Sequence, residues 1–351
     1  MNFMRQTGIL FLTHLRVWWR TPRQAVISLV LSCAFLLVGT QLLNVHVRSG
    51  TRVGLCAGDL PVGRTIENEL AVAGVSTVRY ADGGEGETAL IEGRIVALVG
   101  VTPISLALML PGRNPLIDRE VERILLGVAT RVTHRMPRAG RIIMLAPRRP
   151  PADVTAFMTA SLIPFLIMTL ATINCGMHWL RDWESGTIHA LKALPFHRPA
   201  LLVARTLGGG VLALVILAAA LAVCRAIIPW PLPERLAPWF AVIAVQTLFS
   251  LGFFTAIAAF TRKYLLYVDA SMLLVVLMMF SSATIKPIEA MAGWERVVAH
   301  LTPAFYAVRA MRAAMLGSSP VLAGDMAVLL GCSIVCFAAG HLIFTRSAIT
   351  R

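Results

Sequence analysis

Two long apolar runs follow each other almost without a break in the second half of the chain. Residues 236–261 read LAPWFAVIAVQTLFSLGFFTAIAAFT, and residues 264–285 read YLLYVDASMLLVVLMMFSSATI. A helix of about 20 apolar residues is long enough to cross the hydrocarbon core of a bilayer. Because only Arg262 and Lys263 separate the two runs, the pattern predicts two membrane-spanning helices joined in a tight hairpin.

The overall composition supports a membrane protein. Of the 351 residues, 57% are hydrophobic and 14% are charged, whereas soluble domains contain about 25% charged residues. The formal net charge is +14, which has a simple origin because the cytoplasmic loops of membrane proteins collect Lys and Arg. No basic stripe interleaved with aromatic residues resembles a nucleic-acid interface. We therefore expect no nucleic-acid partner.

Further apolar runs raise the expected number of spans to six. In residues 1–23, Phe11, Leu15, Trp18 and Trp19 share one helical face, which predicts an amphipathic helix lying in the membrane interface. The expected spans are residues 24–47, 154–180, 206–224, 236–261, 264–285 and 321–345. The sequence thus predicts an α-helical membrane protein with an N-terminal amphipathic helix.

Residues 48–153 have a different character. Charged residues, glycines and prolines return there, and no run is long enough to span a bilayer. The β-branched pattern and the apolar periodicity predict strands over 52–56, 76–80 and 95–101, and helices over 65–73 and 118–133. We therefore expect a small α/β domain between the first and second spans.

The short loops carry the basic residues that set the orientation in the membrane. Arg or Lys residues precede the first span, lie between spans two and three and between spans four and five, and follow span six. Such loops remain in the cytoplasm. We therefore expect a multi-pass protein of a bacterial inner membrane with both termini cytoplasmic. Residues 48–153 and 286–320 would then lie outside.

Several catalytic and nucleotide-binding motifs are absent. The sequence contains no GxxxxGKS/T phosphate loop, no HExxH, no GxSxG and no CxxC, and none of its eight His has a second ligand at metal-binding spacing. These absences predict a chain with no ATP site, metal or cofactor of its own. They also argue against a membrane-anchored enzyme.

Two carboxylates fall inside the expected spans. Asp269 and Asp325 each lie about one turn into a span. An Asp at the centre of a membrane costs roughly 2.5–3.5 kcal/mol on insertion scales and much less near the interface. Neither residue therefore resembles a transport-coupling carboxylate at the midplane, and a helix-end role and a proton-relay role both stay open.

The loop between the second and third expected spans, residues 181–205, carries the sharpest local pattern. It begins RDWESGTIHALKALPFHR. Gly186 permits a tight turn, Thr187 can cap a short helix over residues 188–194, and Pro195 ends that helix. One apolar face of that helix consists of Ile188, Leu191 and Leu194. Such a helix suits docking into a groove on a soluble partner; the alternative is a helix lying on the membrane.

This loop resembles a motif of the ABC-2 type transporter permeases. ESGTI at 184–188, followed by Leu191 and LPFHR at 194–198, is similar to the family's E-x-G-T-hydrophobic and L-x-x-x-P-hydrophobic-x-R pattern. LTPAFY at 301–306, followed by AMR at 310–312, is similar to a second family pattern, L-x-P-x-x-Y and a-x-R. The resemblance covers nearly the whole chain, although His189 stands where many members carry an acidic residue.

The resemblance implies the membrane subunit of an ATP-driven exporter. Two permease halves, either two copies of this chain or this chain and a paralogue, would pair with a separate ATPase that binds ATP and Mg. The residues expected to couple to the ATPase are Arg181, Glu184, Gly186, Thr187, Ile188, Leu191, Leu194 and Pro195. Residues 1–23 would be the elbow helix of the family. Residues 286–320 would form re-entrant helices, in which Pro303, Tyr306 and Arg312 shape an external gate.

The expected cargo follows from the apolar character of the spans. The spans are apolar and carry few fixed charges, which suits a lipophilic or amphipathic substrate, such as a drug or a lipid. Similar exporters pass cargo to a periplasmic adaptor and an outer-membrane channel, and residues 48–153 would provide that contact. The alternative function is a membrane-anchored sensor or scaffold whose external domain binds an envelope partner.

Overall fold

The structure is a computed structural model of the chain, and it divides into two compact units. One unit is helical (Met1–Leu43, Met158–Ile285 and Val297–Arg351), and the other contains a β-sheet (Asn44–Phe157 and Lys286–Arg296). The residues that the structure describes are 3–19, 22–42, 52–56, 61–72, 74–91, 94–101, 106–110, 115–135, 142–144, 154–187, 198–228, 230–233, 235–285, 288, 291–317 and 322–346.

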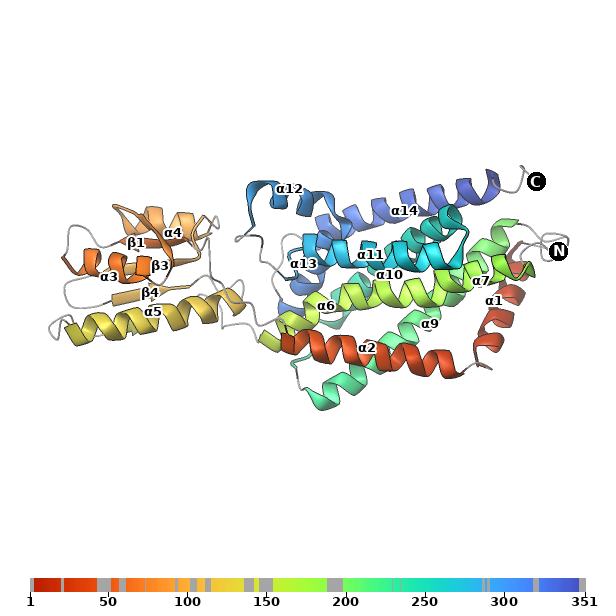
Figure 1. Cartoon of the computed structure of the whole chain (residues 1–351), viewed down its shortest axis with the longest axis horizontal. Coiled ribbons are helices and arrows are strands. Elements are labelled where there is room, and N and C mark those ends of the chain that lie inside the picture. The colour runs from red at the N-terminus through yellow and green to blue at the C-terminus, as the bar shows by residue number, and fades with distance from the viewer. Residues whose placement is uncertain are drawn as a thin grey trace. The chain divides into compact units, whose positions relative to one another are not determined.

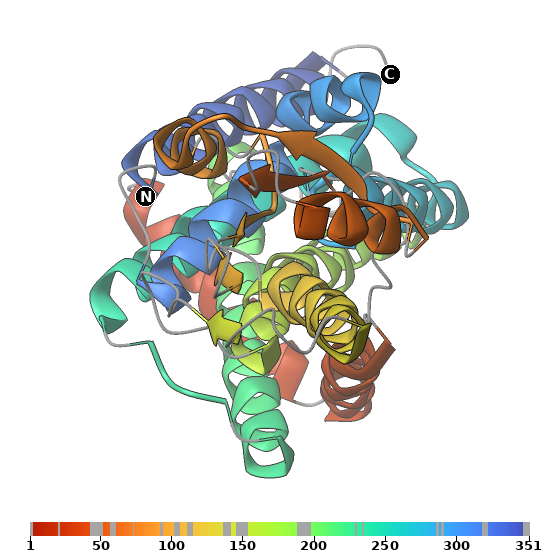
Figure 2. The same ribbon diagram turned by 90° about the vertical axis from the view of Figure 1, so that its left-hand side faces the viewer.

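Helices make up the first unit, and most of them run side by side (Figures 1 and 2). Their bounds are α1 (Phe3–Trp19), α2 (Pro22–Leu42), α6 (Val154–Ala171), η1 (Thr172–Met177), α7 (His178–Glu184), α9 (Arg198–Ile227), α10 (Leu236–Thr261), α11 (Tyr264–Ser281), α12 (Gly293–Leu301), α13 (Pro303–Leu316) and α14 (Leu322–Arg346). Residues 154–157 of α6 and 293–296 of α12 belong to the second unit. α6, η1 and α7 follow one another without a break, and η1 is a π-helix.

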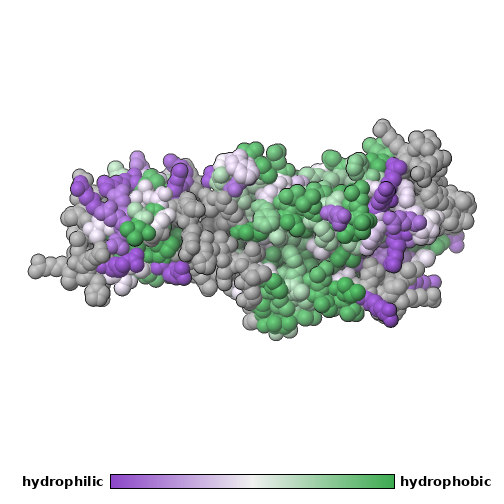
Figure 3. Space-filling view, in the orientation of Figure 1, coloured by the Kyte–Doolittle hydropathy of each residue, from purple (hydrophilic) through white to green (hydrophobic). Residues whose placement is uncertain are grey.

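Five described helical segments are long and apolar enough to cross a membrane. They are Thr155–Glu184, Ala200–Ile227, Leu236–Thr261, Tyr264–Ser281 and Leu322–Ile343. The apolar part of α2, Ala25–Thr40, is shorter. Figure 3 shows a largely apolar surface over the helical unit, which fits a surface in contact with lipid. The chain is thus an α-helical, multi-pass membrane protein, and the sixth span stays a prediction.

The boundaries of several expected segments differ from the sequence prediction. The loop expected over 181–205 is shorter, since α7 continues to Glu184 and α9 already begins at Arg198. Helices continue through these charged residues because Asp182 and Arg205 form an ion pair. The span expected over 264–285 ends at Ser281, where the Ser282 hydroxyl donates to the Met279 carbonyl at 3.0 Å.

The centre of the helical unit is formed by α6 and η1. The apolar window of the α6–α7 segment is 89% buried, whereas the windows of α11 and α14 are 17% buried. Phe165 and Met168 of α6 pack with Phe254 of α10 and Tyr267 of α11 in one core cluster. α6 is therefore surrounded by protein, and α11 and α14 expose most of their apolar surface.

The second unit is a three-layer α/β arrangement around a five-stranded sheet in the order β2-β1-β3-β4-β5. All strand pairs are parallel except β3 with β4. The strands are β1 (Arg52–Cys56), β2 (Ser76–Arg79), β3 (Ala97–Val101), β4 (Leu106–Met109) and β5 (Ile142–Met144). α3 (Pro61–Val72) and α5 (Pro115–Arg135) pack on one face through Ile66, Leu70 and Val121, and α4 (Gly83–Ile91) packs on the other through Ala89 and Leu90.

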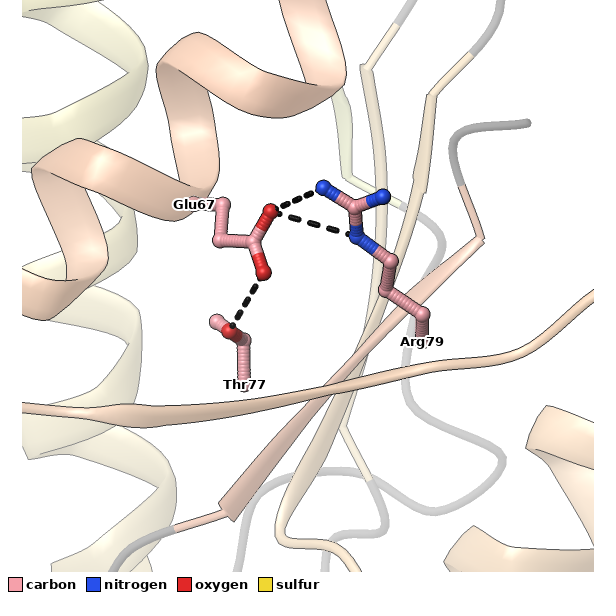
Figure 4. A network of polar contacts seen from close by, with 3 residues as sticks. All are labelled: Glu67, Thr77 and Arg79. Atoms are coloured by element: carbon pink, nitrogen blue, oxygen red, sulfur yellow. Dashed lines mark hydrogen bonds and ion pairs between the residues drawn. The ribbon is translucent and has the colours of Figure 1, made fainter. Parts of the chain in front are cut away.

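A polar cluster joins α3 to the edge strand β2 (Figure 4). The Glu67 carboxylate accepts hydrogen bonds from Arg79 Nε at 3.2 Å and from Thr77 Oγ1 at 3.4 Å. The hydrogen bond from Arg79 is the main reason why the pKa of Glu67 is lowered from its ordinary value. Because the side chains of Arg79 and Glu67 are 53% and 30% exposed, water and salt screen the pair, and it adds little to the stability of the fold.

Candidate coupling site

The helix that leads into the predicted coupling loop ends at a sharp turn. α7, which we call the stem, ends at Glu184, and Ser185 N donates to Arg181 O at 3.0 Å. Gly186 N donates to Trp183 O at 3.2 Å, and Gly186 has a φ of +73°. A residue with positive φ just after a helix satisfies the last carbonyls, and glycine adopts that conformation most easily. The tight turn predicted at Gly186 is therefore present.

The stem contacts the turn between α10 and α11. Glu184 Oε1 accepts a hydrogen bond of 2.8 Å from Tyr264 N, at the first residue of α11. A carboxylate at that position satisfies a free N–H and is favoured by the helix dipole. The guanidinium of Arg262 lies 6.0 Å from the centre of the Trp183 ring. The end of the stem is thus attached to the helical hairpin that follows it in sequence by about 80 residues.

A second set of polar contacts joins the stem to α1 and α9. Asp182 forms an ion pair with Arg205 of α9. The rings of His178 and His14 of α1 lie edge to face, 5.7 Å apart between centroids. Burial, followed by the charge of Arg205, lowers the pKa of His14 to about 4. His14 is therefore neutral at neutral pH, so this contact adds no positive charge beside Arg205.

The structure describes half of the residues predicted to couple to an ATPase. Arg181, Glu184 and Thr187 are exposed at the end of the stem. Ile188, Leu191, Leu194 and Pro195 lie outside the described residues. Sequence reasoning missed the contacts of the stem with His14, Arg205 and Tyr264, because no local pattern links residues that are distant in the chain.

The predicted gate residues lie at the start and in the middle of α13. Pro303 is its first residue, and the Tyr306 hydroxyl donates to His300 O at 2.8 Å. Arg312 donates from Nε to Ser161 Oγ at 2.8 Å and from Nη2 to Ala283 O at 2.9 Å. Arg312 therefore ties α13 to α6 and to the end of α11.

A partly buried ion pair involves a residue that sequence reasoning did not select. Arg309 Nε donates to Asp325 Oδ2 at 2.8 Å, and Arg309 Nη2 also contacts Oδ1. The guanidinium lies 5.0 Å from the centre of the Phe305 ring and 5.5 Å from that of Tyr306. Asp325 thus has a partner on α13, whereas Asp269 is exposed on α11 and its role stays open.

The chain was compared with models of known protein families. The model of the ABC-2 type transporter family matches residues 138–316, which is about half of the chain and includes the stem, α10, α11 and α13. No curated protein matches the chain. The match confirms the resemblance found in the coupling loop, which falls inside the matched region. The chain therefore belongs to the ABC-2 type transporter family.

Proposed function

We propose that the chain is the permease subunit of an ATP-driven exporter that moves a lipophilic or amphipathic substrate out of the cytoplasm or the inner leaflet. Family membership supports the permease role, and permeases of this family typically work with an ABC ATPase subunit. The largely apolar helices with few fixed charges support a substrate of that class.

The observation that carries the proposal is the attachment of the stem to three other helices. α7 continues η1 and α6, and its side chains contact α1, α9 and the start of α11. A force applied at Gly186 would therefore reach several membrane helices at once. A loop that only closed a connection on the membrane surface would not need these contacts.

In the proposed mechanism, the ATPase binds ATP and Mg and grips residues 181–205 from the cytosol. Ile188, Leu191 and Leu194 fill a groove on the ATPase. Glu184 Oε1 is engaged by Tyr264 N, so the Oε2 atom pairs with a basic residue of the ATPase. Closure of the ATPase dimer shifts two permease halves between inward-open and outward-open states, because the ATPase makes different contacts in each state.

We place the protein in a bacterial inner membrane with both termini in the cytoplasm and α2 as a sixth span. Residues 48–153 would then contact a periplasmic adaptor and an outer-membrane channel, and α12 and α13 would form the external gate. The ring and backbone contacts of Tyr306 and Arg312 support a gate whose position is fixed by protein contacts.

Replacement of Gly186 by valine tests the coupling assignment. A left-handed conformation costs an L-residue roughly 1–2 kcal/mol, so the turn after the stem should reorganise. We expect Gly186→Val, and Glu184→Gln to a smaller extent, to reduce co-purification of candidate ABC ATPases and substrate export. Gly8→Ala in α1, where a new Cβ meets nothing within 4 Å, serves as the control. Unchanged ATPase association and export in both test variants would remove the assignment.

A further inference from the structure

The π-helix η1 lies at the junction between the centre of the membrane unit and the stem. Thr172, Asn174 and Cys175 of η1 are 0–1% exposed. A π turn accommodates one residue more than the α-helix around it and leaves its carbonyls less well paired. Such turns often occur at functional sites, and here the stem starts at the next residue, His178.

Tyr267 of α11 occupies the widened turn. Its side chain is 0% exposed, and its hydroxyl donates to Thr172 O at 3.2 Å. The ring and hydroxyl of Tyr267 lie where a Cβ on Gly176 would stand. The hydroxyl therefore satisfies a carbonyl of the π turn, and the missing side chain of Gly176 makes room for the ring.

η1 is also closely packed against α9 and α10. A Cβ on Gly209 of α9 would lie 2.8 Å from the Asn174 carbonyl oxygen and 3.0 Å from the Cys175 side chain. Cys175 Sγ lies 3.5 Å from Thr255 Oγ1 of α10. η1 is thus held between α9, α10 and α11, and its position is determined by close contacts on more than one side.

We propose that η1 sets the rotational register of the stem, with Tyr267 as the positioning residue. Each residue of an α-helix advances the chain by roughly 100° about the axis. If the same residues formed a regular α-helix, the stem would turn by roughly 100° relative to α6. His178 would then leave His14, Asp182 would leave Arg205, and Glu184 would leave Tyr264.

The role of η1 in coupling to an ATPase rests on the proposed function, whereas the rotational register of the stem does not. The three stem contacts come from three different helices, and a single rotation would break all of them together. The π turn therefore allows α6 to pack its core residues on α10 while the stem contacts α1, α9 and α11.

Cross-linking of the cysteines of D182C and R205C by a flexible bifunctional thiol reagent measures the register directly. In the otherwise unchanged chain we expect efficient cross-linking, because the native side chains of the two positions meet in an ion pair and the reagent spans that distance. Tyr267→Phe removes the hydroxyl that holds Thr172 O, and we expect cross-linking to fall roughly tenfold, which corresponds to the loss of one buried hydrogen bond. Ser281→Ala is the control, since it removes from the same helix a hydroxyl that donates to Met278 O of α11 and not to η1.

Deletion of Ile173 in the Tyr267→Phe background separates positioning from general destabilisation. Deletion of one residue converts the π turn into a regular helix that presents the stem in its original direction. We therefore expect the combined variant to recover the cross-link. Unchanged cross-linking in Tyr267→Phe, or a further loss in the combined variant, would overturn the inference. If the cross-links behave as expected but no ATPase binds, only the proposed function fails.

Discussion

Replacement of Gly176 by alanine is expected to destabilise the membrane unit by about 2 kcal/mol. A Cβ at this position would overlap the hydroxyl and ring of Tyr267, which is fully buried. Overpacking of this kind costs about 1–3 kcal/mol, and the severity of the overlap places Gly176 at the upper end. The higher helix propensity of alanine offsets only about 0.8–1 kcal/mol of this cost. The thermal unfolding midpoint of the purified protein in nanodiscs measures the difference.

Gly331→Ala is the matched control for this prediction. Gly331 also lies inside a helix, α14, but a Cβ there meets nothing within 4 Å. Only the propensity gain applies, so we expect an unfolding midpoint that is unchanged or raised. If Gly176→Ala and Gly331→Ala gave the same midpoint, the close approach of Tyr267 to η1 would be wrong.

The membrane helices were predictable from the sequence because a long apolar run has few structural alternatives. Helices α10 and α11 begin where the sequence placed them, since Arg262 and Lys263 interrupt the apolar pattern. The ends of the helices around the coupling loop were less predictable. A charged residue normally indicates the end of a span, but Asp182 and Arg205 neutralise each other within helices.

The candidate site was predictable only where function depends on local backbone geometry. Gly186 was selected because a tight turn needs glycine, and its φ of +73° agrees. The π turn has no comparable sequence signal. A membrane helix has the same hydropathy pattern whether its residues contact protein or lipid, so the pattern does not reveal where a helix is closely packed. Arg309 was missed for a related reason: its partner Asp325 lies 16 residues away on another helix, and only tertiary packing brings the two together.

Removal of the guanidinium in Arg309→Ala is expected to destabilise the protein by about 3 kcal/mol, the lower end of the range for breaking a buried ion pair. Asp325 is 1% exposed, so its carboxylate would remain buried without a counter-ion. Asp325→Asn should cost only about 1 kcal/mol, because Arg309 is 40% exposed and solvent screens its charge. Thermal unfolding in nanodiscs measures both variants.

The asymmetry between the two single variants is what distinguishes an ion pair with one buried partner from a surface pair. In the double variant, the neutral amide introduced by Asp325→Asn no longer needs a cation, so the cost should be well below the sum of the single costs. Arg225→Ala, at an exposed position near the end of α9, controls for loss of a positive charge and should change stability by less than about 0.5 kcal/mol. Equal costs for Arg309→Ala and Asp325→Asn, or strict additivity, would mean that α13 is held to α14 by apolar packing alone. In that case the ion pair would not fix the position of the proposed external gate.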